Sequence, residues 1–237
     1  MNKRIRQYVG LTSAVIAYYI IHEGAHLLYA LSIGVFKQIN FIGLGVQIDV
    51  YADKMTSFQM GIFCLLGCIA TFFVGYLLVL FSSKLKFISS KIIKACLYYI
   101  TIALLFIDPL YLSLICGFVG GGDMNGISLL IPEIFVRIMF GIVFIVNVFV
   151  FKNIVLIKYK EAFEEVSVWK KERHGVVVGI ISVLYIIGMW VKKDLVSTQV
   201  TITLPLVVTS VAVTIFKVAA IALVVLFIKW LTNKLKR

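Results

Sequence analysis

The chain alternates long apolar runs with short polar segments, and this pattern predicts its architecture. A helix needs about 20 consecutive apolar residues to cross the hydrocarbon core of a bilayer. Runs of roughly this length fall at 8–32, 58–82, 92–117, 127–151, 175–191 and 203–231. The sequence therefore predicts an all-α integral membrane protein with about six transmembrane helices.

The segment 36–51 has a different period from the rest of the chain. Apolar Val46, Ile48 and Val50 alternate with polar residues, and Gly43 permits a turn before them. We predict a short β-hairpin directly after the first span. The edge of such a hairpin can hold an extended peptide strand through main-chain hydrogen bonds, here at Val46, Ile48 and Val50. An amphipathic hairpin that lies at the membrane interface explains the pattern equally well.

The runs divide the chain into three parts. Residues 1–151 contain the first four spans and the hairpin, and form the predicted membrane core. Residues 152–174 mix basic residues with glutamates, which is typical of a solvated cytoplasmic helix. Residues 175–237 supply two additional C-terminal spans.

Composition and charge favour a membrane protein and exclude other classes. Hydrophobic residues make up 62% of the chain and charged residues 14%, so no sizeable soluble domain remains. The net charge of +12 would suggest nucleic acid as the partner of a soluble protein. Here the basic residues cluster between apolar runs, where anionic lipid and topology account for them. Most of them fall on one side of the predicted spans, which places both termini in the cytoplasm. We expect a lipid bilayer and no nucleic acid as partner.

The first span contains the strongest chemical signal, the sequence His22-Glu23-Gly24-Ala25-His26. Residues four apart share a helix face, so the two histidines can bind one Zn²⁺. Glu23 can then act as general base on a zinc-bound water. The chain has only 3 histidines in 237 residues, and ionisable groups are costly inside a span. The alternative is a buried polar cluster without metal.

A site with two histidines needs a third ligand. Asp123 follows a run of glycines at 120–122 and precedes Asn125 near the start of the fourth span. We predict that Asp123 is the third zinc ligand and that Asn125 supports it, although Asp123 alone would suggest a helix N-cap. Asp108 is the alternative ligand, because a carboxylate deep in a span needs a partner and the adjacent Pro109 interrupts helix hydrogen bonding.

An HExxH motif in an early span, followed by a β-like hairpin and an aspartate at a glycine turn, resembles the site-2 protease family of intramembrane zinc metalloproteases. The similarity is to the minimal members without a PDZ domain, and it covers about 20–127. The resemblance implies a three-helix core with ligand and base roles at His22, His26, Asp123 and Glu23. The family's usual second motif has an Asn and prolines shortly before an Asp-Gly pair, whereas Asp123 is followed by Met-Asn-Gly. Asp108 therefore stays open as the alternative ligand.

These residues indicate a zinc metalloendopeptidase that hydrolyses peptide bonds within or next to membrane segments of substrate proteins. The expected partners are a membrane-protein or membrane-peptide substrate and a regulatory membrane partner. One alternative is a membrane metallopeptidase similar to the CAAX-processing and HtpX-like enzymes, whose third ligand is a glutamate, here Glu133. Another is a non-catalytic zinc-binding membrane protein, of chaperone or immunity type, that keeps the site for structure.

Several other residues are interpreted as structural. Gly67 lies in the second span, where small residues let helices approach closely. Glu133 and Arg137 are four apart and predict a buried ion pair, with Pro132 bending the helix. The cysteines lie in apolar runs, form no CxxC pair and are expected to be small core residues; they are Cys64, Cys68, Cys96 and Cys116.

Overall fold

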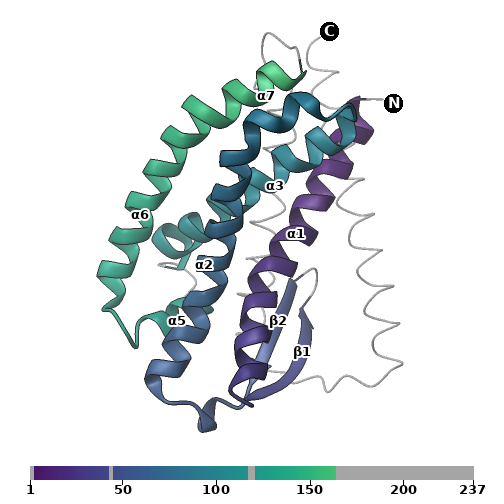
Figure 1. Ribbon diagram of the computed structural model, residues 1–237. Helices are drawn as coiled ribbons and strands as arrows, with labels where there is room; N and C mark the ends of the chain where they lie inside the picture. Colours follow the sequence, from purple (N-terminus) through teal and green to yellow (C-terminus); the bar gives the residue numbers. More distant parts are fainter. Residues whose placement is uncertain (1–2, 43–44, 117–120, 164–237) are drawn as a thin grey trace, which may run out of the picture. The chain divides into compact units, whose positions relative to one another are not determined.

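The structure, a computed structural model, describes residues 3–42, 45–116 and 121–163 (Figure 1). Within these residues, 4 helical segments are long and apolar enough to cross a membrane, which is consistent with the predicted membrane protein. They are Ile5–Ser32, Ser57–Phe87, Lys91–Ile115 and Glu133–Phe163. The predicted fifth and sixth spans, at 175–191 and 203–231, lie outside the described residues.

The fourth span begins and ends later than the sequence predicts. The predicted start at 127 falls at the end of a short helix, and Pro132 is the N-cap of α6 (Glu133–Val150) rather than a bend within it. Proline suits a helix start because the missing N–H would have no partner there. Beyond α6 the helical path continues through a π-helical turn, η4 (Phe151–Val155), into α7 (Leu156–Phe163). The helical path therefore extends into the segment 152–174, for which the sequence predicts a solvated cytoplasmic helix.

The predicted hairpin is present. Helix α1 (Lys3–Ser32) ends before Gly34, whose φ of 71° lies in the left-handed region that favours glycine. The chain then forms a two-stranded antiparallel sheet of β1 (Phe36–Ile42) and β2 (Gly45–Val50). Ile48 is buried, but Val46 and Val50 are half-buried, as are the polar residues between them, so burial along β2 does not follow the predicted alternation.

The start of α2 (Ser57–Phe81) is fixed by a capping box. The main-chain N–H of Gln59 donates to the Thr56 hydroxyl at 3.2 Å, and the Thr56 N–H donates to the Gln59 side chain at 2.9 Å. These bonds satisfy main-chain donors that a helix start leaves free. After a short 3-10 turn, η2 (Ser82–Phe87), Ser90 is the N-cap of α3 (Lys91–Leu110), and its hydroxyl accepts from the main-chain N–H of Ile93.

The long helices pack against one another in a defined order. Helix α1 lies against α3 and α2, α2 also contacts α3, and α6 packs on α3 (Figure 1). Two clusters of buried side chains result. One joins α1, α2 and β2 through Ala30, Phe63 and Ile48. The other, at the opposite ends of these helices, is built on aromatic residues that include Tyr98, Tyr99 and Tyr159.

Pro109 lies inside α3 without breaking it. A proline has no N–H, so the carbonyl four residues earlier loses its helical partner. That carbonyl belongs to Leu105, and it accepts instead from the side-chain amide of the fully buried Asn147, 2.5 Å away. The amide oxygen of Asn147 accepts in turn from the Tyr76 hydroxyl at 2.5 Å. The proline therefore helps to tie α3, α6 and α2 together.

The ion pair predicted on α6 forms, but the prediction that it is buried is wrong. The guanidinium Nε of Arg137 donates to Glu133 Oε1 at 3.0 Å. The Glu133 side chain is nevertheless 49% exposed, because it occupies the first turn of α6. The i,i+4 spacing predicts the contact but not which face of the helix is covered.

Candidate metal centre

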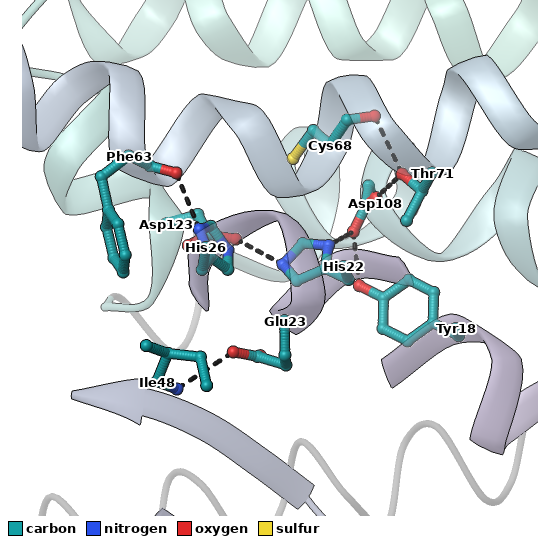
Figure 2. Close-up of polar contacts among 10 residues, drawn as sticks. All are labelled: Tyr18, His22, Glu23, His26, Ile48, Phe63, Cys68, Thr71, Asp108 and Asp123. Carbon is teal, nitrogen blue, oxygen red and sulfur yellow. Dashed lines mark hydrogen bonds and ion pairs between the residues drawn. The ribbon is translucent and has the colours of Figure 1, made fainter. Parts of the chain in front are cut away.

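Two histidines of α1 and one aspartate at the start of α5 (Asp123–Ile127) meet inside the protein (Figure 2). His22 and His26 are 5% and 3% exposed, and one helical turn separates them. Asp123 Oδ2 lies 3.0 Å from Nε2 of His22, and Oδ1 lies 3.5 Å from Nε2 of His26. One ligand atom from each residue lies within 4.8 Å of the others, so the group could hold a metal ion. It is the only such group in the described ranges.

In both histidines, the surroundings of Nδ1 favour a tautomer in which Nε2 is free to bind a metal. Nδ1 of His26 lies 2.7 Å from the Phe63 carbonyl oxygen, which can only accept, so Nδ1 carries the proton. Nδ1 of His22 makes no hydrogen bond with the described residues, but it lies 3.4 Å from a carboxylate oxygen of Asp108, whose charge favours the same tautomer. The Nε2 lone pairs of both rings therefore face the Asp123 carboxylate. Three acceptors that converge in this way require a cation or protons between them.

The glycine turn brings Asp123 to the histidines. Gly121 and Gly122 have φ values of 75° and 61°, which few other residues adopt. Helix α5 then packs closely on α2, where Gly126 lies so near the Cys64 sulfur that a larger residue would collide with it. A short helix that is held in this way can carry one carboxylate into the interior.

Asp123 belongs to the group, whereas Asn125 lies apart from it. Burial disfavours the charged carboxyl of Asp123, and the positive charge of protonated His26 and His22 holds its pKa below the usual range; with both imidazoles neutral, a cation between the three residues has to supply that charge. Asn125 is exposed, and its main-chain N–H donates to the Gly122 carbonyl at 3.2 Å within the turn. The structure therefore brings Asp123 to the histidines and leaves Asn125 in the turn.

Asp108 lies behind His22, on the opposite side of the ring from Asp123 (Figure 2). It is 2% exposed and belongs to α3. The Tyr18 hydroxyl donates to Oδ1 at 2.5 Å, and the Thr71 hydroxyl donates to Oδ2. The carboxylate left open as an alternative ligand thus has three polar neighbours of its own. It is placed to orient His22 rather than to complete the metal group.

Gly67 gives the histidines room. A Cβ atom at this position of α2 would lie 2.6 Å from Nε2 of His26 and 2.7 Å from Nε2 of His22. Any side chain would therefore occupy the space that the two Nε2 atoms face. The interpretation of Gly67 as a packing glycine is incomplete, because the packing it permits is against the metal group itself.

The remaining residue of the motif, Glu23, contacts the hairpin. Its side chain is half-buried, and Oε2 accepts a hydrogen bond from the main-chain N–H of Ile48 in β2, with an N···O distance of 3.1 Å (Figure 2). The Ile48 side chain is 5% exposed and belongs to the buried cluster around the site. The carboxylate that follows the first histidine is thus held by the strand.

Sequence reasoning missed two residues of this site and interpreted others correctly. Tyr18 precedes His22 by four residues, so helical spacing could have placed it on the same face. Thr71 carries no such signal, because only the packing of α2 on α3 brings it to Asp108. The cysteines are free in the structure; Cys64, Cys68 and Cys116 are buried and Cys96 is half-buried, in line with small core residues.

Comparisons of this chain with protein-family models, curated proteins and solved structures find no match.

Proposed function

We propose that this protein is an intramembrane zinc metalloendopeptidase similar to the site-2 proteases. The observation that carries the proposal is the meeting of Asp123 with His22 and His26, which come from segments about a hundred residues apart in the chain. Two imidazoles and a carboxylate form a donor set typical of catalytic zinc, which keeps further positions for water and substrate. The apolar helices support a substrate peptide bond within or next to a membrane segment.

Each residue of the site has a role in this proposal. His22, His26 and Asp123 bind the metal, and zinc there would supply a Lewis acid for peptide hydrolysis. Glu23 takes a proton from the attacking water and returns it to the leaving amine. Asp108 and the Phe63 carbonyl keep both histidines in the tautomer that binds through Nε2. Both termini are proposed to face the cytoplasm, on the charge distribution alone.

The test is cleavage of dye-labelled single-span peptides by purified protein in lipid nanodiscs, with zinc content measured in parallel. Glu23→Gln should bind as much zinc as the wild type. Its cleavage rate should fall by at least about a hundredfold, which is the contribution of a general base to a rate. Undiminished cleavage by this variant would contradict the proposal.

One observation favours a second candidate, a non-catalytic zinc protein. Glu23 is already engaged by the Ile48 N–H, as it would be if its role were to fasten the hairpin to α1. In that case Glu23→Gln, which retains an acceptor, would keep the biological function intact. The glutamate-ligand alternative has less support, because Glu133 is half exposed and paired with Arg137 on α6.

A further inference from the structure

The register of the hairpin determines which main-chain groups of β2 point away from β1. The Tyr51 N–H donates to the Val35 carbonyl at 2.9 Å, and Lys37 forms an ion pair with Asp49 at 3.2 Å. Antiparallel strands bond at every second residue, so position 49 faces β1 whereas positions 48 and 50 face away. The Ile48 N–H therefore lies on the edge of β2 that faces away from β1, and within the described residues Glu23 accepts from it.

An outward-pointing N–H on an edge strand is a donor that can pair with the carbonyl of another strand. Here the carboxylate of Glu23 takes that place, beside the two histidines of the same helix. The burial of the Ile48 side chain fixes the strand, so its N–H points in a constant direction. An N–H has one hydrogen and makes one strong bond, so Glu23 and an added strand cannot both hold it.

We propose that Glu23 is a placeholder for the substrate, and that an extended peptide which adds to the edge of β2 displaces it from the Ile48 N–H. A substrate carbonyl then takes the donor, and the freed carboxylate can act at the metal group. Docking of the peptide on β2 therefore releases Glu23, the general base, from the Ile48 N–H in the same step. This inference rests on the proposed peptidase function, since it assigns the order in which that site is assembled.

The proposal also specifies how the peptide is recognised. Bonds to alternate main-chain groups fix an extended backbone and do not require a particular side-chain sequence. A helical membrane segment has its own N–H and C=O groups bonded internally, so it must unwind before it can pair with β2. An intact helix therefore cannot displace Glu23.

The experiment measures hydrogen exchange of the Ile48 amide in zinc-loaded, full-length protein labelled with ¹⁵N-isoleucine. Ile48 is the only isoleucine of β2, and Ile48→Val assigns its resonance. Exchange should be about tenfold faster in Glu23→Ala, because a bond to a charged acceptor is lost. Glu23→Gln retains an acceptor and should exchange more slowly than Glu23→Ala. Asp53→Ala removes an exposed carboxylate nearby in sequence and should leave the exchange unchanged.

Two zinc-binding probes then separate docking of a strand from binding of metal. A trileucine hydroxamate carries an extended backbone, whereas acetohydroxamate has none. In Glu23→Ala, the tripeptide probe should return Ile48 exchange to the slow rate and acetohydroxamate should not. Relative to acetohydroxamate, the tripeptide probe should bind Glu23→Ala about tenfold more tightly than wild type, because no carboxylate competes for the donor.

The proposal is overturned if Ile48 exchange is independent of Glu23. It is also overturned if the tripeptide probe binds the zinc of Glu23→Ala while Ile48 continues to exchange rapidly. Neither measurement requires catalysis. The wild type could therefore fail to cleave peptides while the exchange results are as expected. That outcome would reject the peptidase function but would still show that Glu23 and a peptide strand compete for the Ile48 N–H.

Discussion

Replacing Asp108 by asparagine removes one negative charge from behind His22 and changes little else in the packing. The side chain is 2% exposed, and the Tyr18 and Thr71 hydroxyls that donate to it can also bond to an amide. What is lost is the carboxylate 3.4 Å from Nδ1 of His22, whose negative charge favours a proton on Nδ1 and leaves Nε2 to bind metal. The perturbation therefore acts on metal affinity through His22.

The expected magnitude follows from this indirect role. Loss of an outer carboxylate typically weakens metal binding by about 10- to 100-fold, which corresponds to about 1.4–2.7 kcal/mol. Asp123→Asn removes a charged ligand 3.0 Å from Nε2 of His22, so we expect it to weaken binding at least about tenfold more than Asp108→Asn does. The order of the two variants distinguishes the orienting residue from the ligand.

The assay is competition for zinc between the purified protein and a chelator of known affinity, at constant pH. Glu23→Gln serves as the control, because Glu23 is not a member of the group that could hold the metal. Unchanged affinity in Asp108→Asn would refute the orienting role. A loss as large as that of Asp123→Asn would show instead that Asp108 is itself a ligand.

Three further predictions concern single side chains. Gly67→Ala places a methyl group 2.6–2.7 Å from Nε2 of both histidines and should lower zinc affinity by at least about tenfold. Gly24→Ala adds a carbon with nothing within 4 Å and should leave the affinity unchanged. The same chelator competition measures both variants. Asn147→Ala leaves the buried Leu105 carbonyl without its partner and should destabilise the protein by about 1–3 kcal/mol, measured by thermal unfolding in detergent. An unchanged melting temperature would contradict that role of Asn147. Arg137→Ala breaks an exposed ion pair and should change the unfolding free energy by less than about 1 kcal/mol, so a larger loss would mean that this face of α6 is covered.

The local parts of this site follow directly from the sequence. The spacing of His22 and His26 places both rings on one helix face, and the change of period after the first span predicts the hairpin. Asp123 was predicted from the need for a third ligand and from the glycines before it. Each of these inferences depends on residues that are close together in the chain.

The parts that the sequence could not predict depend on packing between helices. Asp108 lies in a predicted span and Asp123 next to one, and only the contact of α3 with α1 places Asp108 behind His22. Gly67 resembles any packing glycine until α2 lies against the two rings. The Glu23 carboxylate was expected at the metal, but the free N–H of Ile48 offers it a hydrogen bond that no local pattern specifies.

The measurement that tests the central claim most directly is zinc K-edge X-ray absorption of the purified protein, together with its zinc content. The account predicts about one zinc per chain with nitrogen and oxygen neighbours at about 2.0–2.2 Å, and loss of that signal in His22→Ala. Absence of zinc under conditions that do not strip metal would contradict the account. So would a sulfur neighbour at about 2.3 Å, which would assign the metal to the cysteines of α2 instead.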